Sequence, residues 1–317
     1  MRVHEFDAAA QDVLPPHALG RLADWARSRP ADIALRHKRR GRWKAWRWAD
    51  VAREVDHLAA ALRQHGFGPG SRLALSGAFE PTLLLLALAA AAAGGHAFGL
   101  SRDAEGAGLR RQLERLQPSH VFVHSREGAT RVLAALAGTP GEVVLFSSQA
   151  AARREEQGRV LPLAGLYAGG PVAPARLAWR LAHAAPPLWS EEGTEWEDGL
   201  RLLLAHWLDK GEGLAFPESR ESATRDRRDV APAGLLLSSA RLAGLEHELE
   251  SRLPPPGSLT RRVWDWAQGG HALGRRLRAR VRRLSGLHRL RRVVVDAPDA
   301  VPASGAQGWV HAYREAA

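Results

Sequence analysis

Short apolar runs alternate with helical segments between residues 72 and 146, and this alternation constrains the fold more than any other feature of the chain. Four runs have the length and composition of strands: RLALS (72–76), HAFGL (96–100), HVFVH (120–124) and EVVLF (142–146). The intervening segments have the length of helices: 79–93, 105–116 and 127–137. Strands that alternate with helices in this way predict βαβ units. We therefore expect an α/β fold in layers, with a mostly parallel sheet or sheets flanked by helices.

The segment 79–93 is apolar on every face. Its longest apolar run, Leu83 to Ala93, is far shorter than the roughly 20 residues that a membrane-spanning helix needs. A short helix of this kind is typically buried in a protein core, so we expect burial here. The N-terminal segment MRVHEFDAAAQDV lacks the apolar core of a secretory signal. These features favour a cytoplasmic protein, with peripheral attachment to a membrane left open.

Further elements are predicted on both sides of this region. Helical spacing occurs at 19–29 and 49–65, and the segments 33–37 and 42–48 read as a hairpin. The second half resumes the alternation, with strands at 213–216, 234–239 and 290–297 and helices at 220–229 and 240–253. An Arg/Glu-rich connection at 151–159 and a Pro/Gly-rich stretch at 169–174 separate the halves. We therefore expect a first α/β subdomain at 1–167 and a second, incomplete one at 168–317.

The composition excludes some functions and leaves others open. Without cysteine, the chain has no disulfide, thiolate metal site or cysteine nucleophile. Its formal net charge of +11 is typical of proteins that bind nucleic acid or anionic membranes. However, the only lysines are Lys38, Lys44 and Lys210, Ile33 is the one isoleucine, and asparagine is absent. This usage also fits a GC-rich coding sequence, so the arginine excess has two explanations.

Five segments preserve the order of landmarks in a known family: AWRWADVAREVDHLAAALRQHGFGPGSRLALSG (45–77), EPTLLLLALAAAAAGGHAFGL (80–100), GEGLAFPES (211–219), RRDVAPAGLLLSSARLAGLEHEL (227–249) and LRRVVVDAPDAVP (290–302). Together they resemble the N-terminal part of the long-chain fatty acyl-CoA synthetases, in the adenylate-forming (AMP-binding) superfamily. Ser71 stands where the family usually has Asp. The resemblance covers most of residues 19–302. It implies a layered α/β domain and, in working members, a reaction of fatty acid with ATP to give an acyl-adenylate, which coenzyme A intercepts.

The adenylation chemistry of that family requires a loop of the pattern T-S-G-T-T-G-x-P-K-G. Such a loop holds the ATP phosphates through backbone N–H groups and hydroxyls, while lysine and Mg²⁺ neutralise charge. The nearest segment is SEEGTEWEDG (190–199), in which Asp198 falls at the lysine position. Four glutamates there would repel a triphosphate: Glu191, Glu192, Glu195 and Glu197. We prefer the alternative alignment, in which the loop is lost and 186–217 matches the segment that follows it in the family.

We therefore carry over no catalytic residue. The family's later Tyr-Gly-x-Thr-Glu motif and its C-terminal catalytic lysine would lie after residue 302, so no C-terminal catalytic domain is expected. The family implies ATP with Mg²⁺ and coenzyme A as cofactors, but the residues present give no reason to expect their binding.

Other candidate motifs predict no chemistry. GFGPGS (66–71) connects a helix to a strand, the reverse of a dinucleotide-binding loop, and reads as a turn. His120 and His124 share a strand face, but four residues of extended chain separate them by roughly 13 Å, too far for one metal ion. The acidic run 191–198 could hold Mg²⁺, but charge runs in irregular segments are usually solvated. We expect no metal site.

Nine arginines lie between Arg275 and Arg292, in a segment with helical spacing of apolar residues. The apolar stripe is formed by Leu273, Leu277, Val281 and Leu284. Two interpretations remain open. The stripe packs on the sheet and the arginines face water, or the helix and the upstream Trp264 and Trp266 engage an anionic surface. For the second interpretation, the predicted contact residues are Arg276, Arg280 and Arg283.

Three functions follow as hypotheses. The first is a non-catalytic binding or regulatory module linked to fatty acid metabolism, with an acyl ligand or a protein as its partner. The second is a fatty acid–CoA ligase component that is active only with a partner chain. The third is a peripheral binder of anionic membrane or nucleic acid through the arginine-rich helix. Nucleic acid is the less expected partner, because no base-reading motif accompanies the arginines.

Overall fold

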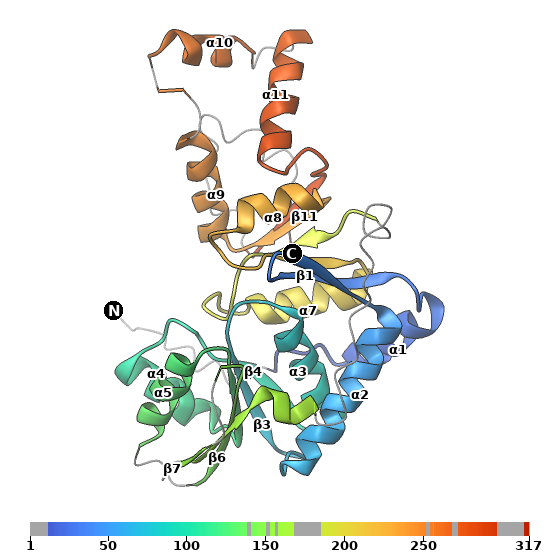
Figure 1. Cartoon of the computed structure of the whole chain (residues 1–317), viewed down its shortest axis with the longest axis vertical. Helices are drawn as coiled ribbons and strands as arrows, with labels where there is room; N and C mark the ends of the chain where they lie inside the picture. Colours follow the sequence, from blue (N-terminus) through green and yellow to red (C-terminus); the bar gives the residue numbers. More distant parts are fainter. Residues whose placement is uncertain are drawn as a thin grey trace, which may run out of the picture. The chain divides into compact units, whose positions relative to one another are not determined.

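The computed structural model describes residues 12–137, 141–149, 153–155, 158–167, 185–251, 254–255, 257–267, 272–296 and 314–316. The chain divides into two compact units, which are described separately (Figure 1). The first unit comprises residues 1–31, 46–174 and 193–210, and the second comprises residues 32–45, 175–192 and 211–317. Each unit therefore takes segments from both sides of the boundary that the sequence suggested at residues 167 and 168.

The sheet of the first unit contains the four predicted strands. Its strands are β3 (Arg72–Ser76), β4 (His96–Gly99), β5 (His120–Val123), β6 (Val143–Ser147), β7 (Arg153–Glu155) and β8 (Gly158–Pro162). They lie in the order β4-β3-β5-β6-β8-β7, and every neighbouring pair is parallel except β7 with β8. The prediction of one largely parallel sheet is confirmed. The prediction of a connection at 151–159 is partly wrong. Pairing of β8 with β6 and of β7 with β8 extends a polar segment that has little intrinsic strand preference.

Helices cover both faces of this sheet. They are α1 (Ala18–Ser28), α2 (Trp48–Gln64), α3 (Pro81–Ala92), α4 (Gly106–Leu116), α5 (Arg126–Leu136) and α7 (Gly199–Lys210), with the 3₁₀ helix η1 (Leu163–Tyr167). Leucines and valines of α4 and α5 pack in one cluster with Val121 and Leu145 of the sheet. Leu75 and Phe122 alternate with these positions and so point to the other face, where α3 contacts β3 and β4.

Helix α3 is buried, as predicted. Every residue from Leu83 to Ala90 is at most 2% exposed. The helix has no need of a polar face, because α2 and the sheet cover it on different sides. Among the described residues, no helix combines the length and the apolarity needed to cross a bilayer.

Three tryptophans connect α1, α2 and α7 within the first unit. The rings of Trp48 and Trp207 stack at 5.1 Å, and Trp25 lies 6.2 Å from Trp48. Trp25 also donates a hydrogen bond of 2.6 Å from Nε1 to the carbonyl of Leu208. Helix α7, which the sequence analysis did not predict, is held in the core of the unit by these contacts.

The second unit contains a seven-stranded sheet. Its strands are β1 (Ile33–Arg39), β2 (Arg42–Arg47), β9 (Leu188–Trp189), β10 (Leu214–Phe216), β11 (Gly234–Leu237), β12 (Arg292–Val295) and β13 (Arg314–Ala316), in the order β13-β12-β11-β9-β10-β1-β2. The strands from β13 to β1 are parallel to their neighbours. The predicted hairpin is confirmed as β1 and β2. Arg40 and Gly41 join these strands with φ values of 51° and 71°, the positive φ pair of a two-residue hairpin turn.

The described residues of the second unit form four helices: α8 (Ala223–Val230), α9 (Ser239–Ser251), α10 (Leu259–Ala267) and α11 (Ala272–Leu284). Leu242, Leu245 and Leu249 of α9 pack with Leu235 and Val293 of the sheet. These contacts explain why the helical spacing of α9 is read correctly from the sequence.

A buried histidine lies at the centre of an aromatic cluster in the first unit. His120 is 3% exposed, its ring lies 5.0 Å from that of Phe67 and 6.2 Å from that of Phe146, and its Nε2 donates to the carbonyl of His65 at 3.1 Å. Burial lowers the pKa of His120, and the charges of His65 and Arg159 lower it further, against the effect of the hydrogen bond to the His65 carbonyl.

The depressed pKa of His120 makes stability dependent on pH. The unfolded state takes up a proton near the ordinary pKa of 6.5, and the folded state does so only at lower pH. We therefore expect the free energy of unfolding to fall as pH is lowered from 7.5 through 6.5 to the folded-state pKa, and then to level off. Urea unfolding from pH 7.5 to 5 measures this slope.

His120→Phe should flatten that slope, because Phe fits the aromatic cluster and does not titrate. The exposed His17→Gln is the matched control and should leave the slope as in the wild type. An equal slope in the wild type and in His120→Phe would contradict the assignment.

Candidate functional site

The acidic segment 190–199, the nearest match to a phosphate loop, divides between the two units: residues 190–192 belong to the second and residues 193–199 to the first. Glu191 and Glu192 are 5% and 3% exposed. The prediction that this charge run is solvated is therefore wrong for these two residues. Residues 190–192 are therefore considered with the second unit and residues 193–199 with the first.

In the second unit, Glu191 is the centre of a buried ion cluster. Its carboxylate accepts hydrogen bonds from Trp189 Nε1 at 2.8 Å and Arg227 Nη1 at 3.1 Å, and it also pairs with Arg241. Arg227 is 1% exposed, and its Nε donates to the carbonyl of Ser285 at 3.0 Å. Burial alone would raise the pKa of Glu191, but the charges of Arg227 and Arg241 and the donated hydrogen bonds hold this pKa below its usual 4.5. Glu191 is therefore ionised and neutralised within the core.

The strand order of the second sheet defines where a ligand would ordinarily bind. The chain passes from β9 to β10 on one side and then returns to β11 on the other side of β9. Ligands of open α/β sheets bind at the carboxyl ends of the strands at such a reversal. Here Ser238, which follows β11, donates from both its N and its Oγ to Glu192 Oε1 at 2.8 Å each. Internal hydrogen bonds therefore occupy the N and Oγ of Ser238.

In the first unit, residues 193–199 form a tight turn fixed to the end of β3. Thr194 N donates to the carbonyl of Gly77 at 2.9 Å, and Gly77 N donates to Thr194 Oγ1 at 3.1 Å. Further along, Trp196 N donates to the carbonyl of Gly193 and Gly199 N to the carbonyl of Trp196. A side chain at Gly199 would meet the Trp196 ring at 2.3 Å, so only glycine fits at this position. The N–H groups of Thr194, Trp196 and Gly199 are therefore used within the protein.

The carboxylate of Glu195 is also engaged. Arg102 binds it with both Nη2 and Nε, each at 2.6 Å, and the two side chains are 27% and 17% exposed. This two-point contact fixes the turn 193–199 to the chain that follows β4. Asp198, at the predicted lysine position, is exposed, has a positive φ of 58°, and lies 3.4 Å from Arg201 Nε.

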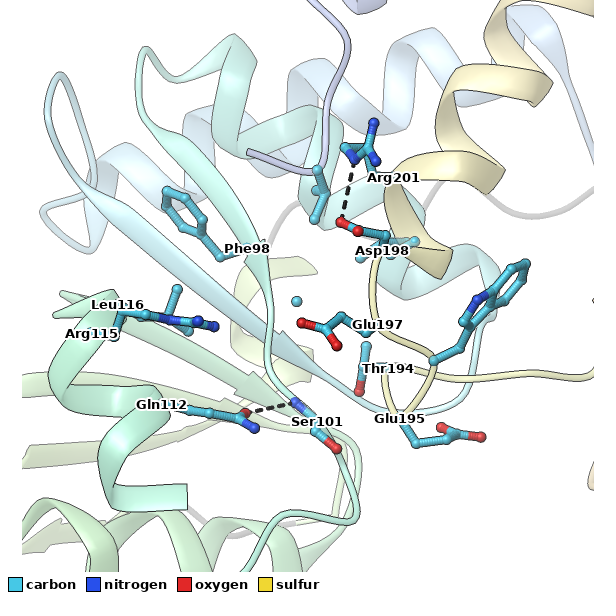
Figure 2. A pocket seen from close by; sticks show the side chains of 14 residues that line it. Phe98, Ser101, Gln112, Arg115, Leu116, Thr194, Glu195, Glu197, Asp198 and Arg201 are labelled. Carbon is cyan, nitrogen blue, oxygen red and sulfur yellow. Dashed lines mark hydrogen bonds and ion pairs between the residues drawn. The ribbon is translucent and has the colours of Figure 1, made fainter. Parts of the chain in front are cut away.

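Next to this turn lies a pocket with a cavity volume of ≈ 330 Å³ (Figure 2). Its apolar wall includes Phe98 of β4, Leu116 of α4 and Leu200 of α7. Its polar wall includes Arg115 of α4, and Glu197 of the turn. Figure 2 shows Arg115 and Glu197 pointing toward one another from opposite sides of the pocket. The pocket therefore combines an apolar surface with side chains of both charges, and among them Arg115 and Glu197 are exposed and face each other.

The pocket is formed by segments that are far apart in the sequence, which explains why the sequence analysis missed it. Gln112 Oε1 accepts a hydrogen bond from Ser101 N at 3.2 Å, so α4 and the end of β4 enclose one side. The turn 194–198 and the start of α7 enclose the other side. The acidic run was the one signal of this site that the sequence carried.

The predicted contact residues Arg276, Arg280 and Arg283 lie on α11 in the second unit, and their side chains are exposed. They do not line the pocket. Leu284 is 55% exposed, so the prediction that the apolar stripe is buried is wrong for this residue. The side chains of Leu273, Leu277 and Trp264 lie outside the described residues. Within the described part of the chain, no group of three His, Asp or Glu side chains could hold a metal ion.

Comparison with known proteins shows what this chain is similar to. Residues 22–177 match the model of the family described as AMP-binding enzyme. This match covers α1, α2 and the strands of the first sheet. No curated protein matches the chain.

Solved structures of adenylate-forming enzymes share the fold. The A-PCP didomain of carboxylic acid reductase from Segniliparus rugosus, in complex with AMP, matches with a TM-score of 0.67 and 12% identity, over 94% of this chain and 50% of that one. Acetoacetyl-CoA synthetase from Streptomyces lividans matches with a TM-score of 0.57 and 15% identity, over 88% and 47%. The luciferase-like enzyme from the Zophobas morio mealworm matches with a TM-score of 0.59 and 11% identity, over 99% and 73%.

The fold therefore defines the class: parallel sheets flanked by helices, as in the N-terminal domains of adenylate-forming enzymes. Within that fold, residues 22–177 are similar to the AMP-binding enzyme family. It spans half of the length of the carboxylic acid reductase didomain.

Proposed function

We propose that this chain is a binding module of the AMP-binding family that does not form adenylates, linked to fatty acid metabolism. The observation that carries this proposal is the turn 193–199, whose N–H groups at Thr194, Trp196 and Gly199 donate to carbonyls of the protein itself. A phosphate loop needs such groups pointing at its ligand. A turn that uses them internally is suited to shape a pocket wall instead.

The charges of the same turn oppose a nucleotide. Glu197 and Asp198 are exposed, and in the nearest match to the phosphate loop Asp198 falls at the lysine position. Two unit charges of the same sign at 4 Å repel each other by about 4 kcal/mol at the effective dielectric constant of a protein surface. A triphosphate carries several such charges, so this turn disfavours its approach.

A second candidate function is a ligase component that works with a partner chain. It is favoured by the match to half of the carboxylic acid reductase didomain, because the residues for the remaining steps would then come from elsewhere. Copurification with a partner that restores ATP-dependent acyl transfer would support this candidate over the first.

The pocket beside the turn is the candidate ligand site for the binding module. Its volume of ≈ 330 Å³ is at the lower end of the range for small-molecule sites, which suits a short or medium acyl chain. Phe98, Leu116 and Leu200 would contact the hydrocarbon, and Arg115 would face the carboxylate. Glu197 would oppose the same carboxylate from the other wall.

Substitutions of the two opposed charges test this site. We expect Arg115→Gln to weaken octanoate binding and Glu197→Gln to strengthen it, each by about two- to fivefold, because exposed charge pairs contribute about 0.2–1 kcal/mol. Isothermal titration calorimetry measures both dissociation constants. Arg111→Gln, which removes an exposed arginine of the same helix outside the pocket, is the matched control.

The same titrations are repeated with ATP and Mg²⁺, with AMP, and with a palmitoyl-adenylate analogue. The proposal expects no change in octanoate affinity with ATP and no saturable heat from the nucleotides. Saturable nucleotide binding would contradict the non-adenylating function. Equal octanoate affinity in the Arg115, Glu197 and Arg111 variants would contradict the pocket assignment alone.

A further inference from the structure

Helices α10 and α11 of the second unit expose large apolar side chains. Among the described residues, four large hydrophobic side chains are exposed, and three of them lie on these helices: Leu259 at 77%, Trp266 at 53% and Leu284 at 55%. The two helices contact each other, and Figure 1 shows them beyond α9, away from the strands of the second sheet. Exposed apolar residues that gather in one region mark an interaction surface.

Exposed arginines occur on the same two helices. Arg276, Arg280 and Arg283 follow the i, i+4, i+7 spacing that places residues on one face of a helix. Leu284 is adjacent to Arg283 and four residues after Arg280, so it borders this arginine face. No acidic residue occurs between Asp265 and Asp296, so α11 carries only positive charge.

Helix α10 also combines exposed apolar side chains with an exposed arginine. Leu259 and Trp266 are seven residues apart, which places them on one face of the helix. Arg262 is exposed between them. Arg261 is not one of these exposed arginines, because it forms an ion pair of 2.6 Å with Glu250 of α9.

We propose that α10 and α11 form a surface that binds an anionic lipid bilayer. The arginines of α11 contact lipid phosphate and carboxylate groups, while Leu259, Trp266 and Leu284 enter the interface between headgroups and acyl chains. Arginines beside exposed Leu or Trp side chains, as Arg280 and Arg283 are beside Leu284, can bind lipid headgroups while the apolar side chains enter the interface. A nucleic acid would satisfy the arginines but offers no apolar layer for Leu259 and Leu284. This surface is independent of the proposed ligand pocket, which lies in the first unit.

Vesicle sedimentation tests the arginines. The full chain is mixed with vesicles of phosphatidylcholine containing 30% phosphatidylserine, and with pure phosphatidylcholine vesicles, at 0.1 M salt. Each arginine near an anionic surface strengthens binding about fivefold, so the triple variant Arg276→Gln, Arg280→Gln, Arg283→Gln should bind the anionic vesicles about 100-fold more weakly. Pure phosphatidylcholine should bind the wild type weakly.

The matched control removes the same charge elsewhere. Arg110 and Arg111 of α4 and Arg126 of α5 are exposed in the first unit, and the triple variant with Gln at these positions has the same net charge as the α11 variant. It should bind anionic vesicles within about twofold of the wild type, because the proposed surface on α10 and α11 is unchanged in this variant. Equal losses in the two triple variants would overturn the proposal, because binding would then depend on net charge alone.

The apolar side chains separate a bilayer from other polyanions. The double variant Leu259→Ser, Leu284→Ser keeps every arginine, and both side chains are exposed, so its fold should be retained and is checked by thermal unfolding. We expect it to lose at least tenfold in vesicle affinity while its retention on heparin and duplex DNA is unchanged. Unchanged vesicle binding, or duplex DNA binding tighter than vesicle binding at 0.1 M salt, would refute the membrane surface and favour a nucleic acid.

Discussion

Glu191→Gln lowers the free energy of unfolding of the second unit by about 3–5 kcal/mol, the cost typical of removing one partner from a buried ion pair. Gln keeps the shape of the side chain and can still accept a hydrogen bond from Trp189. It cannot neutralise Arg227, which is 1% exposed and lies 3.1 Å from the carboxylate in the wild type. An uncompensated charge would then remain in the core of the unit. Urea unfolding followed by tryptophan fluorescence measures the loss.

The matched control is Glu105→Gln, which breaks an ion pair of 2.9 Å with Arg131 in which Glu105 is 71% exposed. Exposed pairs contribute about 0–1 kcal/mol, so this change should be small. The pH dependence gives a further test. Because the pKa of Glu191 is depressed, its stabilisation is complete above pH 4.5 and is lost as pH falls through the folded-state pKa. The difference in free energy of unfolding between the wild type and Glu191→Gln should therefore become smaller in acid. Equal destabilisation by Glu191→Gln and Glu105→Gln would contradict the assignment of Glu191 to a buried ion cluster.

We expect no acyl-adenylate or acyl-CoA above a protein-free blank when the chain is incubated with palmitate, ATP, Mg²⁺ and coenzyme A. Loss of one electrostatic donor to a transition state typically costs about 10²–10³ in rate. Here the N–H groups of the turn 193–199 are used internally, and Asp198 stands where a lysine would be required. Because such groups act as a unit, the separate factors cannot be multiplied, but their effects have the same sign.

Asp198→Lys tests whether charge alone is responsible. It restores a cation at the family's lysine position, but it leaves the N–H groups of Thr194, Trp196 and Gly199 bonded to the protein. We expect this variant to remain at the level of the blank in an assay of radiolabelled adenylate. Turnover by the wild type would refute the non-adenylating function, and turnover gained by Asp198→Lys would show that the turn can still admit a nucleotide.

The first sheet could be predicted because its signal is local. Each strand from β3 to β6 is a short apolar run, and each helix between them has its own spacing, so neighbouring residues carry the information. The hairpin of β1 and β2 is similar, because Gly41 readily adopts the positive φ that a two-residue turn requires. The strands β7 and β8 lack such a signal, and their extended conformation comes from the pairing of β8 with β6 and of β7 with β8.

The burial of the acidic segment could not be predicted from residues that are neighbours in the sequence. A run of glutamates in an irregular segment predicts solvation, but Glu191 is buried because Arg227 and Arg241 reach it from 36 and 50 residues away in the sequence. Charge neutralisation at such separations depends on which strands are neighbours, and the sequence does not state that order.

The sequence by itself determined the fold class, the buried helix α3 and the absence of a recognisable phosphate loop, since each depends on residues that are adjacent or helically spaced. Only the tertiary structure decided that the turn 193–199 uses its own N–H groups, that a pocket opens beside it, and that Leu284 borders an exposed arginine face. The physical reason is that burial and hydrogen-bond satisfaction are properties of the surroundings of a group, and those surroundings come from segments that are distant along the chain.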